Sequence, residues 1–187
     1  MKKALFLLAI MSILSCTNDL TEKQKKEYIT KGKEIAQATM KNLGRNLMKQ
    51  MKAGGTQAAI PFCNKSAYPL TEAMEKQYNV SIKRTALKLR NPKNSPNTAE
   101  EKILNEYLAK IKNGEKLTPI VQKEQDNKVH FYTPIKLQKK CVACHGVLNK
   151  QVTSKTDSIL KSLYPNDKAT GFKPNDLRGI WSISFNQ

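Results

Sequence analysis

The chain has 187 residues and a formal net charge of +18, from 33 Lys and Arg against 15 Asp and Glu. This length, with 39% hydrophobic residues, is enough for one globular domain with its own core. The lysines are spread along the chain with few aromatic residues and no helix-turn-helix or zinc-finger pattern, which argues against nucleic acid as a partner. The positive charge would instead attract anionic lipid headgroups or an acidic redox partner. The alternative is that the lysines only keep the surface solvated.

Residues 1–15 predict an export signal. Two lysines precede an apolar run over residues 4–14, which is too short to span a bilayer. The run ends in Ser15-Cys16, which resembles a bacterial lipoprotein signal, in which the cysteine becomes the acylated first residue; an ordinary signal peptide with an incidental cysteine is the alternative. We expect cleavage after Ser15, a mature charge of +16 because the leader holds two lysines and no acid, and a lipid anchor on Cys16 in the bacterial envelope, facing the periplasm.

Residues 16–28 are expected to form a tether and the start of a helix. Thr21 and Gln24 have the spacing of a capping box, and apolar residues then recur at three- and four-residue steps. Gly54-Gly55 should end this long helix. Its methionines, Met40, Met48 and Met51, are possible iron ligands, but at helical spacing methionines are more often core residues.

A second helix is predicted from Thr56, with an interruption at Pro69 and an end near Tyr78. Apolar residues surround Cys63 in this helix, so we expect the thiol to face the interior. If Cys16 carries lipid and the two later cysteines carry a cofactor, Cys63 is left over. An odd thiol in an exported chain should be paired, buried or ligating.

The rest of the chain alternates strands and helices. The expected buried positions of its first helix are Ile103, Leu104, Tyr107 and Leu108. The predicted elements are a strand at 80–90, a loop at 91–97, a helix at 98–111, a hairpin of strands 117–122 and 129–137, a helix at 154–163 and a strand at 177–185. Helices first and an antiparallel sheet afterwards predict an α+β fold.

The most informative motif is Cys141-Val142-Ala143-Cys144-His145. This is the attachment signature of a c-type haem: each thiol can add to one vinyl group, and the histidine can face the iron. Zinc would need four ligands, and the other candidates beyond the leader and Cys16 are Cys63 and His130. A redox dithiol would sit in a βαβ pattern, which is lacking, and a disulfide would leave the histidine without a role. An address outside the cytoplasm favours a single covalent haem.

Several motifs together resemble one family, the single-haem c-type cytochrome domain with a PAS-like fold, long known as a domain of unknown function. The resemblance extends over about residues 29–185. It is carried by 84–96 (Arg-Thr-Ala-Leu-Lys-Leu-Arg-Asn-Pro-Lys-Asn-Ser-Pro) with Glu100, by Tyr132-Thr133-Pro134-Ile135, by 141–146, by Tyr164-Pro165 with Asp167, Ala169 and Gly171-Phe172, and by Asp176 with Arg178-Gly179.

This resemblance implies a PAS-like haem c domain over 29–187, with a long N-terminal helix and inserted helices. It also implies that Cys63 is the second axial ligand opposite His145. A plain buried cysteine is the alternative, and His130 is a competing ligand. Candidates for pairing with the haem propionates are arginines, because a guanidinium binds a carboxylate in bidentate fashion: Arg84, Arg90 and Arg178.

Two functions follow from a haem held by His145 and Cys63. The first is a redox or diatomic-gas sensor, because thiolate ligation favours ferric iron and weakens on reduction, so that Cys63 would act as a switch read by a signalling partner in the envelope. The second is an electron carrier whose basic surface steers an acidic partner. Catalysis would require an open iron position and acid–base groups, and only His130 could supply another imidazole, so we do not expect an enzyme.

Overall fold

The computed structural model describes residues 19–186. The predicted export signal and the lipidation at Cys16 lie outside the described residues. Among the helices within that range, none is both long enough and apolar enough to cross a membrane.

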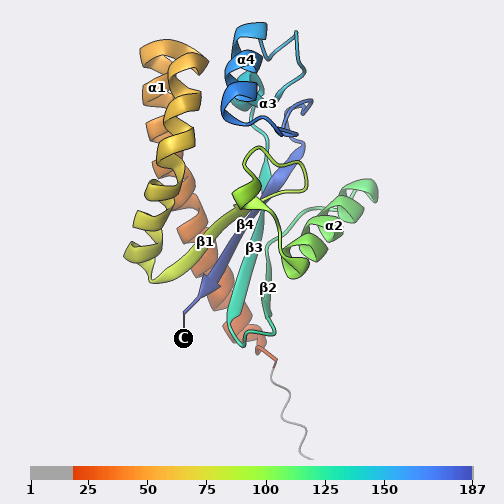
Figure 1. The fold of residues 1–187 in the computed structure, drawn as a ribbon. Helices are drawn as coiled ribbons and strands as arrows, with labels where there is room; N and C mark the ends of the chain where they lie inside the picture. Colours follow the sequence, from red (N-terminus) through yellow and green to blue (C-terminus); the bar gives the residue numbers. More distant parts are fainter. Residues whose placement is uncertain (1–18, 187) are drawn as a thin grey trace, which may run out of the picture.

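Helix α1 (Glu22–Tyr78) is one long element that folds back on itself (Figure 1). Thr21 and Gln24 form the predicted capping box at its start. Gly54 (φ −167°, ψ 26°) and Gly55 (φ 63°, ψ −151°) leave helical geometry, which confirms the predicted break and divides α1 into a first half (22–53) and a second half (56–78). The predicted interruption at Pro69 is wrong: the second half continues through it, since a proline removes only one backbone bond that packing can offset.

The sheet contains four antiparallel strands in the order β1-β4-β3-β2. They are β1 (Val80–Thr85), β2 (Ile120–Lys123), β3 (Val129–Lys136) and β4 (Leu177–Phe185). The last strand of the chain therefore lies between β1 and β3. The predicted strand at 80–90 is too long, because pairing with β4 ends at Thr85↔Ile180 and residues 86–90 leave the sheet.

The first half of α1 covers one face of the sheet, where Ile35 and Ala36 pack with Phe131 and Ile183. Gly32 makes this approach possible: a Cβ at that position would lie 2.6 Å from Cδ1 of Phe131. The helix presents only this narrow face to the sheet, so Met40 and Met48 are 45% and 37% exposed, and the prediction that they are core residues is wrong.

Helix α2 (Thr98–Lys112) packs on the other face of the sheet. Ile103, Leu104 and Tyr107 are buried there with Tyr132 and Ile180. Leu108 is 44% exposed, contrary to prediction, because a helix with a single neighbouring layer buries a narrow stripe.

The remaining elements gather at one end of the sheet, at the top of Figure 1. They are the 3₁₀ turns η1 (Pro92–Asn94) and η2 (Lys139–Cys141) and the helices α3 (Val142–His145) and α4 (Ser154–Leu163). A hydrogen bond of 2.7 Å between the Oγ1 atoms of Thr56 and Thr156 joins α4 to the second half of α1. The mixed helix and antiparallel sheet confirm the predicted α+β class.

Candidate functional site

The Cys-x-x-Cys-His motif lies on η2 and the single turn of α3. Residues three apart on a helix share a face, so this turn brings Cys141 and Cys144 to the same side. The turn closes through a 2.8 Å bond from the Gly146 amide to the Val142 carbonyl. A side chain at Gly146 would be crowded, because its Cβ would lie 2.6 Å from that same carbonyl oxygen.

His145 is held in one orientation. Its Nδ1 lies 2.7 Å from the carbonyl oxygen of Ala169, and its ring meets Phe172 edge-on at 6.4 Å between centroids. Burial, with the charges of Arg90 and Arg178, holds the pKa of His145 well below its ordinary value. The ring is therefore neutral, Nδ1–H donates to Ala169, and Nε2 keeps the lone pair that a metal ligand requires.

A cavity of about 220 Å³ lies beside the motif. Cys141 and His145 line it, and so do Arg84, Arg90 and Arg178, the three arginines predicted to bind propionates. The structure thus brings five of the seven predicted cofactor-binding residues to one cavity.

The three arginines have different partners. Arg90 is occupied by Asp167, with Nη2 to Oδ2 at 2.9 Å. Arg178 donates from Nη1 to the Lys88 carbonyl (3.1 Å), while its buried Nε has no partner among the described residues. Arg84 lies 5.7 Å from the Trp181 ring centroid, and within residues 19–186 it has no acidic partner. Arg84 and Arg178 are therefore the two free to bind an anion.

The charge balance at the cavity also favours an anion. Burial lowers the pKa of Arg84. Burial and the neighbouring charge of Arg90 lower the pKa of Arg178 to about 10, and Asp167 opposes this shift. Cations that are partly desolvated with a single acid between them gain stability from a bound carboxylate or phosphate.

Cys63 approaches this cluster from the second half of α1. Burial raises the pKa of its thiol, and the charges of Arg84 and Arg90 oppose that rise. Burial also raises the pKa of the Cys144 thiol, again opposed by Arg90, and Cys63 adds to the rise. One turn before Cys63, Ile60 belongs to the apolar cluster against which Cys144 packs. Cys63 does not line the 220 Å³ cavity itself.

His130 lies elsewhere. Its Nε2 is 3.0 Å from Oδ2 of Asp126, in the turn between β2 and β3. The first residue of β3 that lines the cavity is Ile135, five positions later, which is roughly 17 Å along a strand. The alternative of His130 as the second ligand is therefore not supported by its position. In the described part of the chain, no group of three His, Cys, Asp or Glu side chains is arranged to hold a metal ion.

Sequence reasoning missed the role of Ala169. Its carbonyl orients His145, but an alanine offers only backbone atoms for this purpose, so its side chain gives no signal. Asp167 accepts the Ala169 amide (2.7 Å) and so helps to place this carbonyl. Its pairing with Arg90 required the fold to be known.

Comparisons with known proteins agree on a family. No curated protein matches this chain. Among solved structures, the "cyanobacterial heme-protein Tll0287" is similar, with a TM-score of 0.59 and 22% identity over 90% of this chain and 98% of that one, which supports the predicted PAS-like α+β fold. The model of the Tll0287-like family matches residues 17–186, nearly the whole chain predicted to be mature. The predicted family is thereby confirmed, and the chain belongs to the Tll0287-like family.

Proposed function

We propose that this chain is a c-type haem protein, with one haem attached to Cys141 and Cys144 and its iron held by His145 and Cys63. The observation that carries the proposal is the placement of His145, whose Nδ1 is bonded to a carbonyl and whose ring lines a cavity with unpaired arginines. The solved structure with the same fold is that of a heme-protein. When bound, haem supplies an iron that changes oxidation state; the chain supplies attachment, ligands and counter-charges.

Replacing Cys144 with alanine should abolish two-thioether attachment. The protein should be made with cytochrome c assembly factors and examined by haem staining after denaturing electrophoresis and by the pyridine haemochrome spectrum. Wild-type protein should show two saturated vinyl groups, and Cys144→Ala one at most. Ser154→Ala, at an exposed site on α4, is the control and should resemble wild type. Unchanged attachment in Cys144→Ala would rule out the haem assignment.

We further propose that the protein is a sensor of redox state or of a diatomic gas. Cys63 lies on the second half of α1, between the Gly54-Gly55 break and the end of the helix, where Met74 packs in the core cluster of the sheet and Glu75 accepts the Ile82 amide of β1. Release of Cys63 from the iron would let the second half of α1 shift, its contacts with β1 would carry that shift to the sheet, and a partner in the envelope would read it. Carbon monoxide added to the reduced protein distinguishes the roles: a changed spectrum supports Cys63 release, whereas an unchanged one favours a carrier that keeps both ligands.

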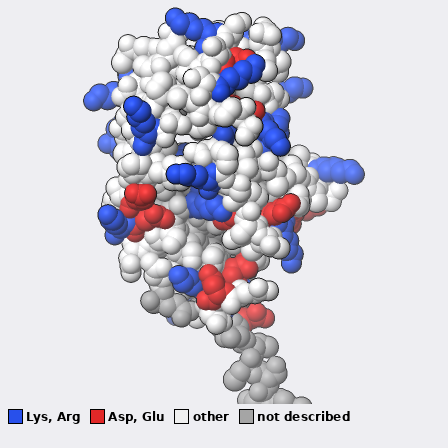
Figure 2. Space-filling view, in the orientation of Figure 1, with Lys and Arg blue, Asp and Glu red and all other residues white. Residues whose placement is uncertain are grey.

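The distribution of charge favours electron transfer as a second function. Residues 127–156, which include the motif, contain six lysines and no acid. In Figure 2 the upper end, which bears α3 and α4, is mostly white with scattered blue side chains and little red, and most of the red lies in the lower half. A basic surface beside a redox centre would speed association with an acidic partner. This function predicts that electron transfer to a small acidic redox protein slows as salt rises; a salt-independent rate would count against it.

The lipid anchor proposed at Cys16 has its own test. In cells that process lipoproteins, wild-type protein should sediment with membranes, and Cys16→Ser should appear in the soluble periplasmic fraction, because two or more acyl chains are needed for stable anchoring. Thr17→Ser is a matched control and should stay with the membrane. Retention of Cys16→Ser on membranes would contradict lipidation and leave the basic surface or a protein partner as the cause.

A further inference from the structure

Arg90 connects three segments that meet behind the motif. Its Nε lies 3.0 Å from Oδ2 of Asp167, and its Nη2 lies 2.5 Å from the Cys144 carbonyl and 3.4 Å from the Ala169 carbonyl. The side chains of Arg90 and Asp167 are 14% and 6% exposed. Nε and Nη2 of Arg90 both contact Oδ2 of Asp167, and two donors on one oxygen of a buried carboxylate restrict the geometry of the pair. We infer that Arg90 and Asp167 are positioning residues for His145.

The path from this pair to His145 is short. Asp167 accepts the Ala169 amide on Oδ1 (2.7 Å), and the carbonyl of the same Ala169 accepts Nδ1–H of His145 (2.7 Å). Arg90 therefore binds the Asp167 carboxylate, which shapes the 167–169 turn, and also contacts the Ala169 carbonyl, which orients the His145 ring. A partner of this kind fixes the orientation of a ligating imidazole and raises its basicity.

The other side of the motif is tied to the same pair. The Phe172 amide donates to the His145 carbonyl (2.9 Å), and the Lys168 amide donates to the Leu89 carbonyl (2.7 Å), next to Arg90. The 167–172 segment is thus bonded both to α3 and to the chain that carries Arg90. Loss of the Arg90–Asp167 pair would therefore disturb His145 in two ways: through the Ala169 carbonyl that accepts its Nδ1–H, and through the Phe172 amide that donates to its backbone carbonyl.

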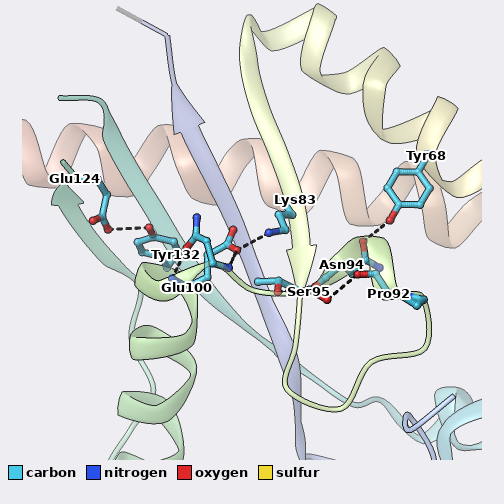
Figure 3. A network of polar contacts seen from close by, with 10 residues as sticks. Tyr68, Lys83, Pro92, Asn94, Ser95, Glu100, Glu124 and Tyr132 are labelled. Atoms are coloured by element: carbon cyan, nitrogen blue, oxygen red, sulfur yellow. Dashed lines mark hydrogen bonds and ion pairs between the residues drawn. The ribbon is translucent and has the colours of Figure 1, made fainter. Parts of the chain in front are cut away.

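The loop that follows Arg90 is held from the sheet and from α1. Figure 3 shows the loop after β1, in which Asn94 accepts from the Tyr68 hydroxyl (2.7 Å). The Asn94 carbonyl accepts from the Thr85 hydroxyl (2.8 Å). At the far end of the loop, buried Glu100 pairs with Lys83 of β1 (2.6 Å). Because Tyr68 lies on the same half of α1 as Cys63, this loop links the two proposed ligand segments.

The hydrogen bonds of Arg90 differ from those of the other two arginines at the cavity. Nε and Nη2, two of its three nitrogens, are occupied by one carboxylate and two carbonyls, whereas Arg84 and Arg178 keep donors free at the same cavity. Removing one member of a buried pair leaves the other charge without a partner, which destabilises the turn rather than the anion site. This inference rests on the proposed function, because it assigns His145 as the ligand that the pair positions.

The test follows the Nδ1–H proton of His145 by paramagnetic NMR of the ferric holoprotein, and compares Asp167→Asn and Arg90→Lys with Asp157→Asn, which removes the ion pair between Asp157 and Lys161 on α4. In the first two variants this proton should exchange with solvent roughly tenfold faster, the effect of losing about one hydrogen bond. The wild-type rate should persist in Asp157→Asn, because its ion pair on α4 involves neither the 167–169 turn nor His145. Circular dichroism and haem staining verify fold and attachment.

The outcomes separate the two proposals. Wild-type protein without covalent haem would refute the proposed function. Covalent haem with an unchanged Nδ1–H exchange rate in Asp167→Asn and Arg90→Lys would overturn the inference alone. It would also be overturned if Asp157→Asn accelerated exchange as much as Asp167→Asn does, or if both pair variants failed to fold, since the pair would then serve the fold in general. If only Asp167→Asn fails to fold, Arg90→Lys decides.

Discussion

Cys63→Ala is expected to keep its haem and lose its thiolate character. The absorption and electron paramagnetic resonance spectra should change, and the midpoint potential should rise by on the order of 100 mV, because a thiolate donates charge that favours ferric iron. The surroundings suit this role, since Arg84 and Arg90 favour the charged thiolate against the effect of burial. Spectroelectrochemical titration of wild type and variant measures the difference.

The matched control for this experiment is Ser66→Ala. Ser66 lies three residues after Cys63 on the same half of α1 and is half-buried like it, so the change tests the helix without removing a sulfur. Its spectrum and potential should match those of wild type. If Cys63→Ala also matched wild type, Cys63 would be a buried thiol and the second ligand would have to be sought elsewhere.

Gly32→Ala is expected to destabilise the protein by about 2–3 kcal/mol, the usual cost of overpacking a well-packed core. The new methyl group would enter the ring of Phe131, which is fully buried at the centre of the sheet. Alanine favours helix over glycine by only about 1 kcal/mol, so the clash dominates. Urea unfolding followed by circular dichroism, with the variants in the same haem state, gives the free energies.

Gly44→Ala provides the comparison on the same helix. A Cβ at that position meets nothing within 4 Å, so only the gain in helix propensity remains, and stability should rise by up to about 1 kcal/mol. Both substitutions replace glycine with alanine, but their expected effects on the free energy of unfolding have opposite signs. Equal stabilities would contradict the packing of the first half of α1 against the sheet.

The sequence predicts the bounds of helices and strands well where a local pattern of residues is enough to set them. Helix α4 and strand β4 have the predicted bounds, and the glycine pair breaks α1 as expected. The predictions are wrong where the structure of a segment depends on the element that packs or pairs with it. The alternation over 80–90 continues beyond the point where β4 stops pairing, and the helical periodicity of Met40 and Leu108 does not reveal that each helix meets only one layer.

The residue types of the candidate site could be predicted from the sequence, but not the contacts between them. The motif names Cys141, Cys144 and His145 directly, and the three arginines could be nominated by charge. Which of the three arginines pairs with an acid could not be predicted, because Asp167 and Arg90 are 77 residues apart in the sequence. The position of His130 likewise follows from the register of β3 and not from its residue type.

The most direct test of the whole account is the absorption and electron paramagnetic resonance spectrum of the exported protein, oxidised and then reduced with dithionite. The account predicts covalent haem with a low-spin ferric thiolate signal, and a change of coordination on reduction as Cys63 is released. Covalent haem without thiolate character, or with both ligands kept on reduction, would contradict the sensor function. An absence of haem in protein matured with the assembly factors would contradict the site itself.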